Sequence, residues 1–233
     1  MTPHRRARLV SLLNPRSAIE RVAALRYGHI ASSQEGEDLL ILRTLGESTV
    51  GTYVEVGAND PFRFSNSAML YRRGWNGVHI DGDPTCCDRL RRWRSRAIVE
   101  NAIISSSSSS HVFYTYDDTI YNTVDSELVA ARRRRGLNPN GSFDVESRTL
   151  STVLEECGVE EFDLLIVDTE GHDREVLSSL DWRRWRPQLV VAEILGVRGL
   201  DRIAEDPLVR DMAERGYELV SRLFESAVFQ RSR

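Results

Sequence analysis

The most constraining feature of the sequence is a short, almost continuously apolar run at residues 162–167, Phe-Asp-Leu-Leu-Ile-Val. A strand of this composition is typical of the centre of a parallel sheet, where both faces are buried. A second such run, Gln-Leu-Val-Val-Ala, follows at residues 188–192 after a helical stretch. Parallel strands need crossover connections, usually helices, so this alternation predicts an α/β fold.

The same alternation extends along most of the chain. We expect further strands at 50–56, 77–81, 97–100 and 111–116, and helices at 34–45, 65–73, 150–157 and 172–180. Asp83-Pro84 and Asp206-Pro207 each predict a helix start, because Asp caps a helix and proline suits its first turn. Residues 217–223 and 227–230 resemble a closing hairpin. This order of strands and helices predicts a Rossmann-like, seven-stranded, mostly parallel sheet with an antiparallel edge.

Composition and charge narrow the class of protein. A chain of 233 residues, 41% of them hydrophobic, is long enough for one sizeable core. We expect a basic helical extension over 1–33 and one domain over 34–233. The net charge of −4 argues against a nucleic-acid partner, and three cysteines without metal-site spacing argue against a disulfide framework. No apolar stretch is long enough for a signal peptide or a membrane span, so we expect a cytoplasmic location.

Polar residues follow the first three predicted strands, where an open parallel sheet binds its ligands. Gly57 permits close backbone approach to a ligand, although a tight turn would explain it equally, and Glu55 could face a cationic amine. Asp81 can accept hydrogen bonds from both hydroxyls of a ribose, or it could cap a helix, a role that Asp83 already fills. Asn101 could recognise the edge of an adenine or be an ordinary turn residue.

Acidic residues cluster after the later strands. Asp168, Glu170 and Asp173 lie within six positions of one another with His172 among them, and Glu193 ends the next strand. Such density is unfavourable in a buried place unless the groups are paired or used. Asp168 and Glu193 could bind Mg²⁺, which prefers oxygen ligands. His172 has an ordinary pKa suited to a general base, although it could also be a solvated histidine at a helix end.

Several longer segments together resemble the FkbM family of methyltransferases, in the order of that family and over residues 33–193. They are SQEGEDL (33–39), YVEVGAN (53–59), FSN (64–66), LYRRGW (70–75), IDGDP (80–84), YNT (121–123), RTL (148–150), IVDTEG (166–171) and SLDW (179–182). The resemblance implies a class I methyltransferase fold and S-adenosylmethionine as cofactor. It also implies Glu55, Gly57, Asn59 and Asp81 as cofactor contacts, with Asp168, Glu170 and Glu193 at the reacting end.

The resemblance further implies O-methylation of a hydroxyl on a sugar, glycolipid or polyketide-type compound, so that the partner is a small-molecule or glycan acceptor. We expect His172 or Glu170 to take the hydroxyl proton, or a metal held by Asp168 and Glu193 to acidify it. The Arg132–Arg135 and Ser105–Ser110 runs match no family motif, and we expect both to be solvated loops. A homodimer is one option for the assembly.

Three other classes of protein fit the sequence less well. A nucleotide-sugar or NAD-dependent enzyme would need a glycine series to cradle phosphates, and the sequence has none after its first strand. A non-catalytic binding module would not need the acidic cluster after the fourth strand, which is present. Methylation of nucleic acid would need a basic face interleaved with aromatic residues, which the arginine cluster lacks.

Overall fold

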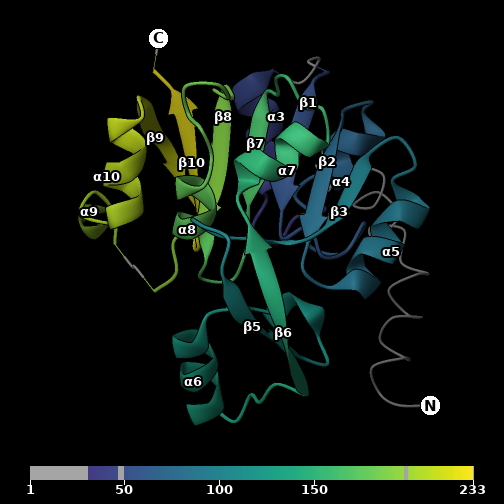
Figure 1. Ribbon diagram of the computed structural model, residues 1–233. Coiled ribbons are helices and arrows are strands. Elements are labelled where there is room, and N and C mark those ends of the chain that lie inside the picture. The colour runs from purple at the N-terminus through teal and green to yellow at the C-terminus, as the bar shows by residue number, and fades with distance from the viewer. Residues whose placement is uncertain (1–30, 47–49, 197–198, 233) are drawn as a thin grey trace, which may run out of the picture. The chain divides into compact units, whose positions relative to one another are not determined.

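The computed structural model describes residues 31–46, 50–196 and 199–232, so most of the expected N-terminal extension lies outside the described residues. Residues 32–233 form one compact unit. Its centre is a seven-stranded sheet in the order β3-β2-β1-β7-β8-β10-β9 (Figure 1). Strands β1 to β3, β7 and β8 are parallel, whereas β10 runs antiparallel to both β8 and β9. The expected sheet, with its antiparallel edge, is therefore confirmed.

The central strands lie close to where their composition predicts them. β7 (Leu164–Val167) and β8 (Leu189–Glu193) are adjacent, and all four residues of β7 are buried. β7 pairs on its other side with β1 (Thr52–Val56), which places the first strand of the chain at the centre of the sheet. β2 (Asn76–Asp81) and β3 (Ile98–Asn101) continue outward from β1. β9 (Tyr217–Arg222) and β10 (Ser226–Arg231) form the expected hairpin.

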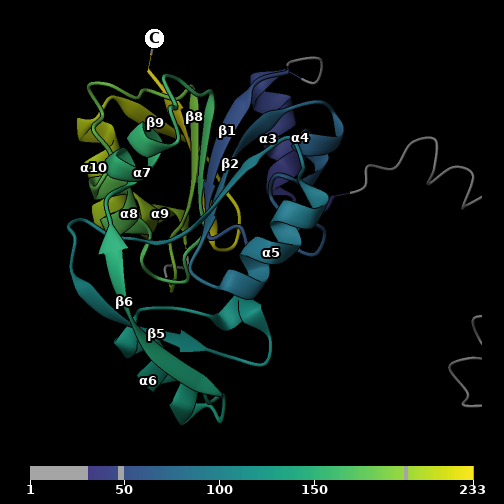
Figure 2. The same ribbon diagram turned by 45° about the vertical axis from the view of Figure 1, so that its right-hand side comes forward.

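Helices cover both faces of this sheet (Figure 2). One face packs against α7 (Leu150–Glu156), α8 (Asp173–Ser178) and α10 (Pro207–Glu214) through residues such as Val153, Val176 and Met212. The other packs against α3 (Glu37–Leu45), α4 (Ala68–Arg72) and α5 (Pro84–Trp93). The side chains of Asp83 and Asp206 cap α5 and α10 by accepting from the backbone N–H two residues on, as predicted. A short helix, α9 (Leu200–Ile203), precedes α10.

A lobe that the sequence did not predict is inserted between β3 and α7. It holds a small sheet in the order β4-β6-β5, formed by β4 (Ile103–Ile104), β5 (Ser110–Thr115) and β6 (Gly141–Arg148). It also contains the 3₁₀ turn η1 (Thr119–Tyr121) and α6 (Ser126–Arg134). Figures 1 and 2 show β5, β6 and α6 projecting from one end of the large sheet.

This lobe corrects two expectations. Arg132–Arg134 belong to the last turn of α6 and not to a loop, and Asp125 caps the start of that helix. Ser105 is buried and donates its backbone N–H to Arg148 over 3.0 Å, and Ser110 begins β5. Neither run is therefore wholly a solvated loop.

Candidate functional site

One cavity at the carboxyl ends of the central strands gathers residues from both halves of the chain. The space within it, including the part open to solvent, is about 1060 Å³. Its lining includes Glu55 near the end of β1, Gly57 and Asn59 in the turn that follows, and Asp81 at the end of β2. It also includes Asp168, Glu170 and His172 after β7, and Glu193 at the end of β8. The structure thus brings together eight of the nine residues that the sequence selected.

Gly57 brings the two halves of the chain into close contact. Its φ is +81°, and a Cβ atom there would lie 1.8 Å from the backbone oxygen of Asp168. Only glycine adopts this conformation readily and leaves room for that carbonyl. The turn after β1 therefore lies directly against the end of β7.

Asp81 is fixed by backbone donors from two turns. It is 8% exposed. Its Oδ2 accepts the N–H of Asn59 over 2.8 Å, and its Oδ1 accepts the N–H of Asp83 over 2.8 Å. Burial raises the pKa of this carboxyl to about 6. Each carboxylate oxygen can accept a further hydrogen bond, so Asp81 can still receive two donors from a ligand.

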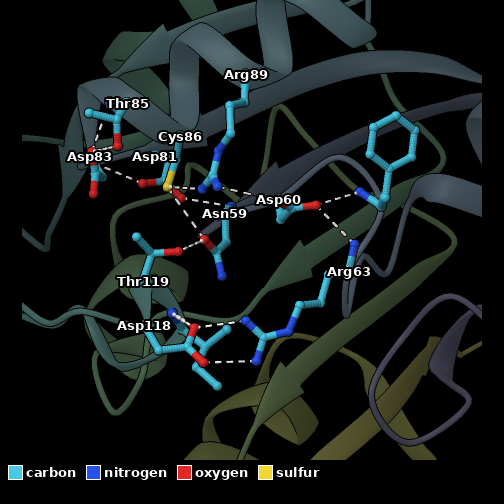
Figure 3. A network of polar contacts seen from close by, with 12 residues as sticks. Asn59, Asp60, Arg63, Asp81, Asp83, Thr85, Cys86, Arg89, Asp118 and Thr119 are labelled. Atoms are coloured by element: carbon cyan, nitrogen blue, oxygen red, sulfur yellow. Dashed lines mark hydrogen bonds and ion pairs between the residues drawn. The ribbon is translucent and has the colours of Figure 1, made fainter. Parts of the chain in front are cut away.

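Asn59 joins the turn after β1 to the inserted lobe, as Figure 3 shows. Its side-chain oxygen accepts hydrogen bonds from Thr119 Oγ1 over 2.6 Å and from Cys86 Sγ over 3.4 Å. Nearby, the guanidinium of Arg63 forms two hydrogen bonds of 2.8 and 2.9 Å with Asp118. These contacts hold η1 beside the cavity.

Asn101 is the one selected residue that does not line this cavity. It is exposed, and its side-chain amide donates to the backbone oxygen of Asp81 over 2.8 Å. The wall beyond β3 is formed instead by Ala102, Ile103 and Phe113. The absence of a side chain at Gly82 leaves room for Ile103, since a Cβ atom at Gly82 would lie 2.2 Å from Ile103 Cδ1. The surface next to Asp81 is therefore apolar and shaped in part by the inserted lobe.

The other end of the cavity is acidic. Carboxylate oxygens of Asp168, Glu170 and Glu193 lie within 4.8 Å of one another. Burial, followed by repulsion between neighbouring carboxylates, raises the pKa of Asp168 and of Glu193 well above the ordinary range. Among the described residues, the buried Oε2 of Glu193 has no hydrogen-bond partner. Asp173 lies behind this group, and burial raises its pKa to about 7.

Arg132 of α6 forms an ion pair with Glu170. The same guanidinium donates to the backbone oxygen of Tyr121 over 2.8 Å. Glu170 has a φ of +52°, and its backbone oxygen accepts a hydrogen bond from Thr123. Burial raises the pKa of Glu170, and Arg132 opposes that shift. Sequence reasoning missed Arg132 because no local pattern shows that α6 folds back to β7.

His172 occupies the N-cap position of α8, and its side chain is 14% exposed. Its Nε2 lies 3.0 Å from the hydroxyl of Ser105, and its ring packs edge-on against His111 with centroids 5.6 Å apart. Burial lowers the pKa of His172. The imidazole is therefore neutral near pH 7 and able to accept a proton.

Residues of the segment 34–37 also line the cavity, and the sequence analysis did not predict this. Glu37 accepts a hydrogen bond from the hydroxyl of Ser226 over 2.7 Å, and Glu35 accepts the backbone N–H of Glu225 over about 3.1 Å. All four residues line the cavity. The sequence signal for this part of the wall is the resemblance of residues 33–39 to the FkbM family.

Sequence comparison decides the family. Residues 55–219 match the family described as Methyltransferase FkbM domain. The chain belongs to the FkbM methyltransferase family. It is an S-adenosylmethionine-dependent methyltransferase, and its mostly parallel seven-stranded sheet with an antiparallel edge is the one expected of the class I type. No protein of curated function matches the sequence significantly.

Several solved structures are similar to this FkbM methyltransferase at low identity. A TehB-like SAM-dependent methyltransferase from Corynebacterium glutamicum is 13% identical, with a TM-score of 0.44 over 94% of this chain and 97% of that one. An O-methyltransferase from Bacillus cereus, solved in complex with SAH, is 12% identical, with a TM-score of 0.43 over 93% and 89%. The 1,6-didemethyltoxoflavin-N1-methyltransferase of Burkholderia thailandensis is 11% identical, with a TM-score of 0.43 over 100% and 92%.

Within the part of the FkbM methyltransferase that the structure describes, every helix is too short or too polar to span a bilayer.

Proposed function

We propose that the cavity binds S-adenosylmethionine with its nucleoside at the β1–β2 end. Asp81 would accept hydrogen bonds from the ribose hydroxyls, and Glu55 would face the ammonium group of the methionine part. Gly57 and Asn59 bring the backbone turn after β1 against the ligand. The apolar wall of Ile103 and Phe113 suits the face of the adenine base, since flat aromatic rings favour apolar neighbours.

We propose that the acidic end transfers the methyl group to a hydroxyl of a small-molecule or glycan acceptor. The acceptor oxygen forms a bond to the methyl carbon as the sulfur–methyl bond breaks, and S-adenosylhomocysteine leaves uncharged. The hydroxyl proton goes to the imidazole of His172, whose lowered pKa keeps it neutral. Asp168 would orient the hydroxyl by hydrogen bonding. Alignment of the two reactants supplies most of the rate enhancement, because the sulfonium is already activated.

The FkbM resemblance, and not the shape of the cavity, supports a sugar, glycolipid or polyketide-type compound as the acceptor. A divalent cation is a second way to acidify the hydroxyl. Asp168 and Glu193 offer the oxygen ligands that Mg²⁺ prefers, and Oε2 of Glu193, which has no partner in the described part of the chain, fits such a role. Glu170 is less suited, because Arg132 already neutralises it. A bound Mg²⁺ would lower the pKa of a coordinated hydroxyl.

The observation that carries the proposal is that Asp81 and Asp168, on either side of Gly57, line one cavity. The test combines calorimetric titration with S-adenosylhomocysteine and a methyl-transfer assay on hydroxyl acceptors. Asp168→Asn should lower turnover at least tenfold and keep the affinity for S-adenosylhomocysteine within about threefold. Unchanged turnover would refute the assignment of Asp168. Loss of activity in EDTA, restored by Mg²⁺, would select the metal-assisted route, and full activity in EDTA would select His172.

A further inference from the structure

A chain of hydrogen-bonded polar side chains crosses the β1–β2 ladder on the face of the sheet covered by α3 and α4. Tyr53 and Glu55 lie on β1, and His79 lies on β2 directly opposite Glu55 in the parallel register. Their exposed fractions are 1%, 2% and 0%. Apolar side chains such as Trp75 and Leu164 lie around Tyr53, and the guanidinium of the buried Arg94 interacts electrostatically with Glu55 and Tyr53. A buried polar group in such a place is costly unless it is hydrogen-bonded.

One arrangement of protons satisfies every bond in the chain. His79 Nδ1 lies 2.8 Å from Oε2 of Glu55, and His79 Nε2 lies 3.0 Å from the hydroxyl of Tyr53. With the proton on Nδ1, the imidazole donates to the carboxylate and accepts from the phenol. The hydroxyl of Ser67 donates to the same Oε2 over 2.7 Å. The Glu55 carboxylate is therefore held at one oxygen by two donors.

Tyr53 is suited to be the terminal donor of this chain. Burial, together with the nearby Glu55 carboxylate, raises the pKa of its hydroxyl, so the phenol keeps its proton at any physiological pH. Space for its ring comes from Gly77, the residue opposite it on β2. A Cβ atom at Gly77 would lie 2.7 Å from Cδ2 of Tyr53 and 2.0 Å from its backbone oxygen.

The second oxygen of Glu55 has a different environment. Oε1 has no hydrogen-bond partner among residues 31–46, 50–196 and 199–232, and Glu55 lines the cavity. Packing alone does not explain this chain, because apolar side chains of similar volume often serve a buried site as well or better than ionic ones. Two donors on Oε2 leave Oε1 as the oxygen available to a ligand.

We propose that His79, supported by Tyr53, is a positioning residue that fixes Glu55 with Oε1 ready to receive the ammonium group of the cofactor's methionine part. The proposal rests on the proposed function, in which Glu55 contacts that ammonium. His79 itself does not line the cavity. It acts through the Glu55 carboxylate, whose rotation it restricts. The Glu55 side chain therefore loses its conformational entropy when the protein folds and not when the cofactor binds.

The test compares two ligands on the full chain. S-adenosylhomocysteine carries the ammonium group, whereas 5′-methylthioadenosine keeps the nucleoside and lacks the amino-acid part. His79→Leu should weaken binding of S-adenosylhomocysteine about tenfold and change binding of 5′-methylthioadenosine less than twofold. His79→Asn should restore most of the lost affinity, because an asparagine amide can donate from near the Nδ1 position. Equal weakening of both ligands, or of neither, would overturn the proposal.

A second variant protects the test against misfolding of His79→Leu. Tyr53→Phe removes one hydroxyl and should weaken S-adenosylhomocysteine binding two- to fivefold, again without effect on 5′-methylthioadenosine. Wild-type affinity for both ligands in Tyr53→Phe, with His79→Leu unfolded, would also overturn the proposal.

Two further measurements separate this inference from the proposed function. If the wild-type protein binds neither ligand, the proposed function fails. If Glu55→Gln loses affinity for S-adenosylhomocysteine selectively while the His79 and Tyr53 variants do not, the proposed function stands and only the role of His79 is wrong.

Discussion

The backbone N–H of Asn59 donates to Oδ2 of Asp81 over 2.8 Å, which ties the turn after β1 to the end of β2. With the N–H of Asp83 on the other oxygen, the carboxylate is fixed before any ligand arrives (Figure 3). A preorganised acceptor of this kind loses little entropy when a ribose binds. The proposed nucleoside end of the site is thus built from backbone contacts between neighbouring strands.

Asp81→Asn should weaken binding of S-adenosylhomocysteine 10- to 100-fold. A hydrogen bond to a charged group is worth about 1.5–3 kcal/mol, and the amide retains only part of that acceptor capacity. Asp88→Asn is the matched control, because Asp88 is an exposed residue on the neighbouring helix α5. Calorimetric titration of both variants checks this, and equal affinities would remove Asp81 from the site.

The affinity for S-adenosylhomocysteine should also depend on pH through Asp81. Its pKa is raised to about 6, so the carboxylate is charged at pH 8 and becomes protonated as the pH falls through 6. Protonation removes acceptor capacity, so affinity should be constant above about pH 7 and then decline by up to about tenfold per pH unit. Titrations from pH 8 to 5 should show this decline in the wild type and a flatter profile in Asp81→Asn. A rise in affinity on acidification would contradict the prediction.

Gly57→Ala should abolish cofactor binding or prevent folding, because its Cβ would lie 1.8 Å from the backbone oxygen of Asp168. Gly158→Ala is the matched control: Gly158 also has a positive φ, of +68°, but a Cβ there would meet nothing within 4 Å. The control should lose only about 1–2 kcal/mol of stability, the usual cost of alanine in this conformation. Thermal denaturation and ligand titration compare the two, and similar behaviour would show that the contact is not essential.

Arg132→Gln should lower the free energy of unfolding by about 1–3 kcal/mol, because it leaves Glu170 half-buried beside other carboxylates without its cation. Arg133→Gln, on the exposed side of α6, should change it by less than about 0.5 kcal/mol. Denaturant titration measures both. The double change Arg132→Gln with Glu170→Gln should recover part of the loss, and failure to recover it would show that Arg132 acts through another contact.

The parts of the fold and of the site that could be predicted from the sequence depend on local patterns. The apolar runs at β7 and β8 fix the centre of the sheet, and strand ends in a parallel sheet share one edge, so Asp81 and Asp168 could be placed together. The Asp-Pro pairs before α5 and α10 gave correct helix starts because capping depends on a few adjacent residues.

What the sequence did not predict depends on long-range contacts. The pairing of Arg132 with Glu170 spans 38 residues, and it depends on a lobe whose longest strand, β6, is mostly exposed and polar. His79 was not selected at all, since its partners Glu55 and Tyr53 lie on another strand and only the ladder register brings them together. Asn101 was selected because it ends a strand, but its amide folds back on the backbone of Asp81.

The central claim is that one cavity holds the nucleoside at one end and the reacting groups at the other. A crystal structure with S-adenosylhomocysteine tests it most directly. The account predicts both ribose hydroxyls within hydrogen-bond distance of Asp81 and the sulfur on the side of Asp168 and His172. A ligand bound outside this cavity, or one whose sulfur points away from Asp168, would contradict it.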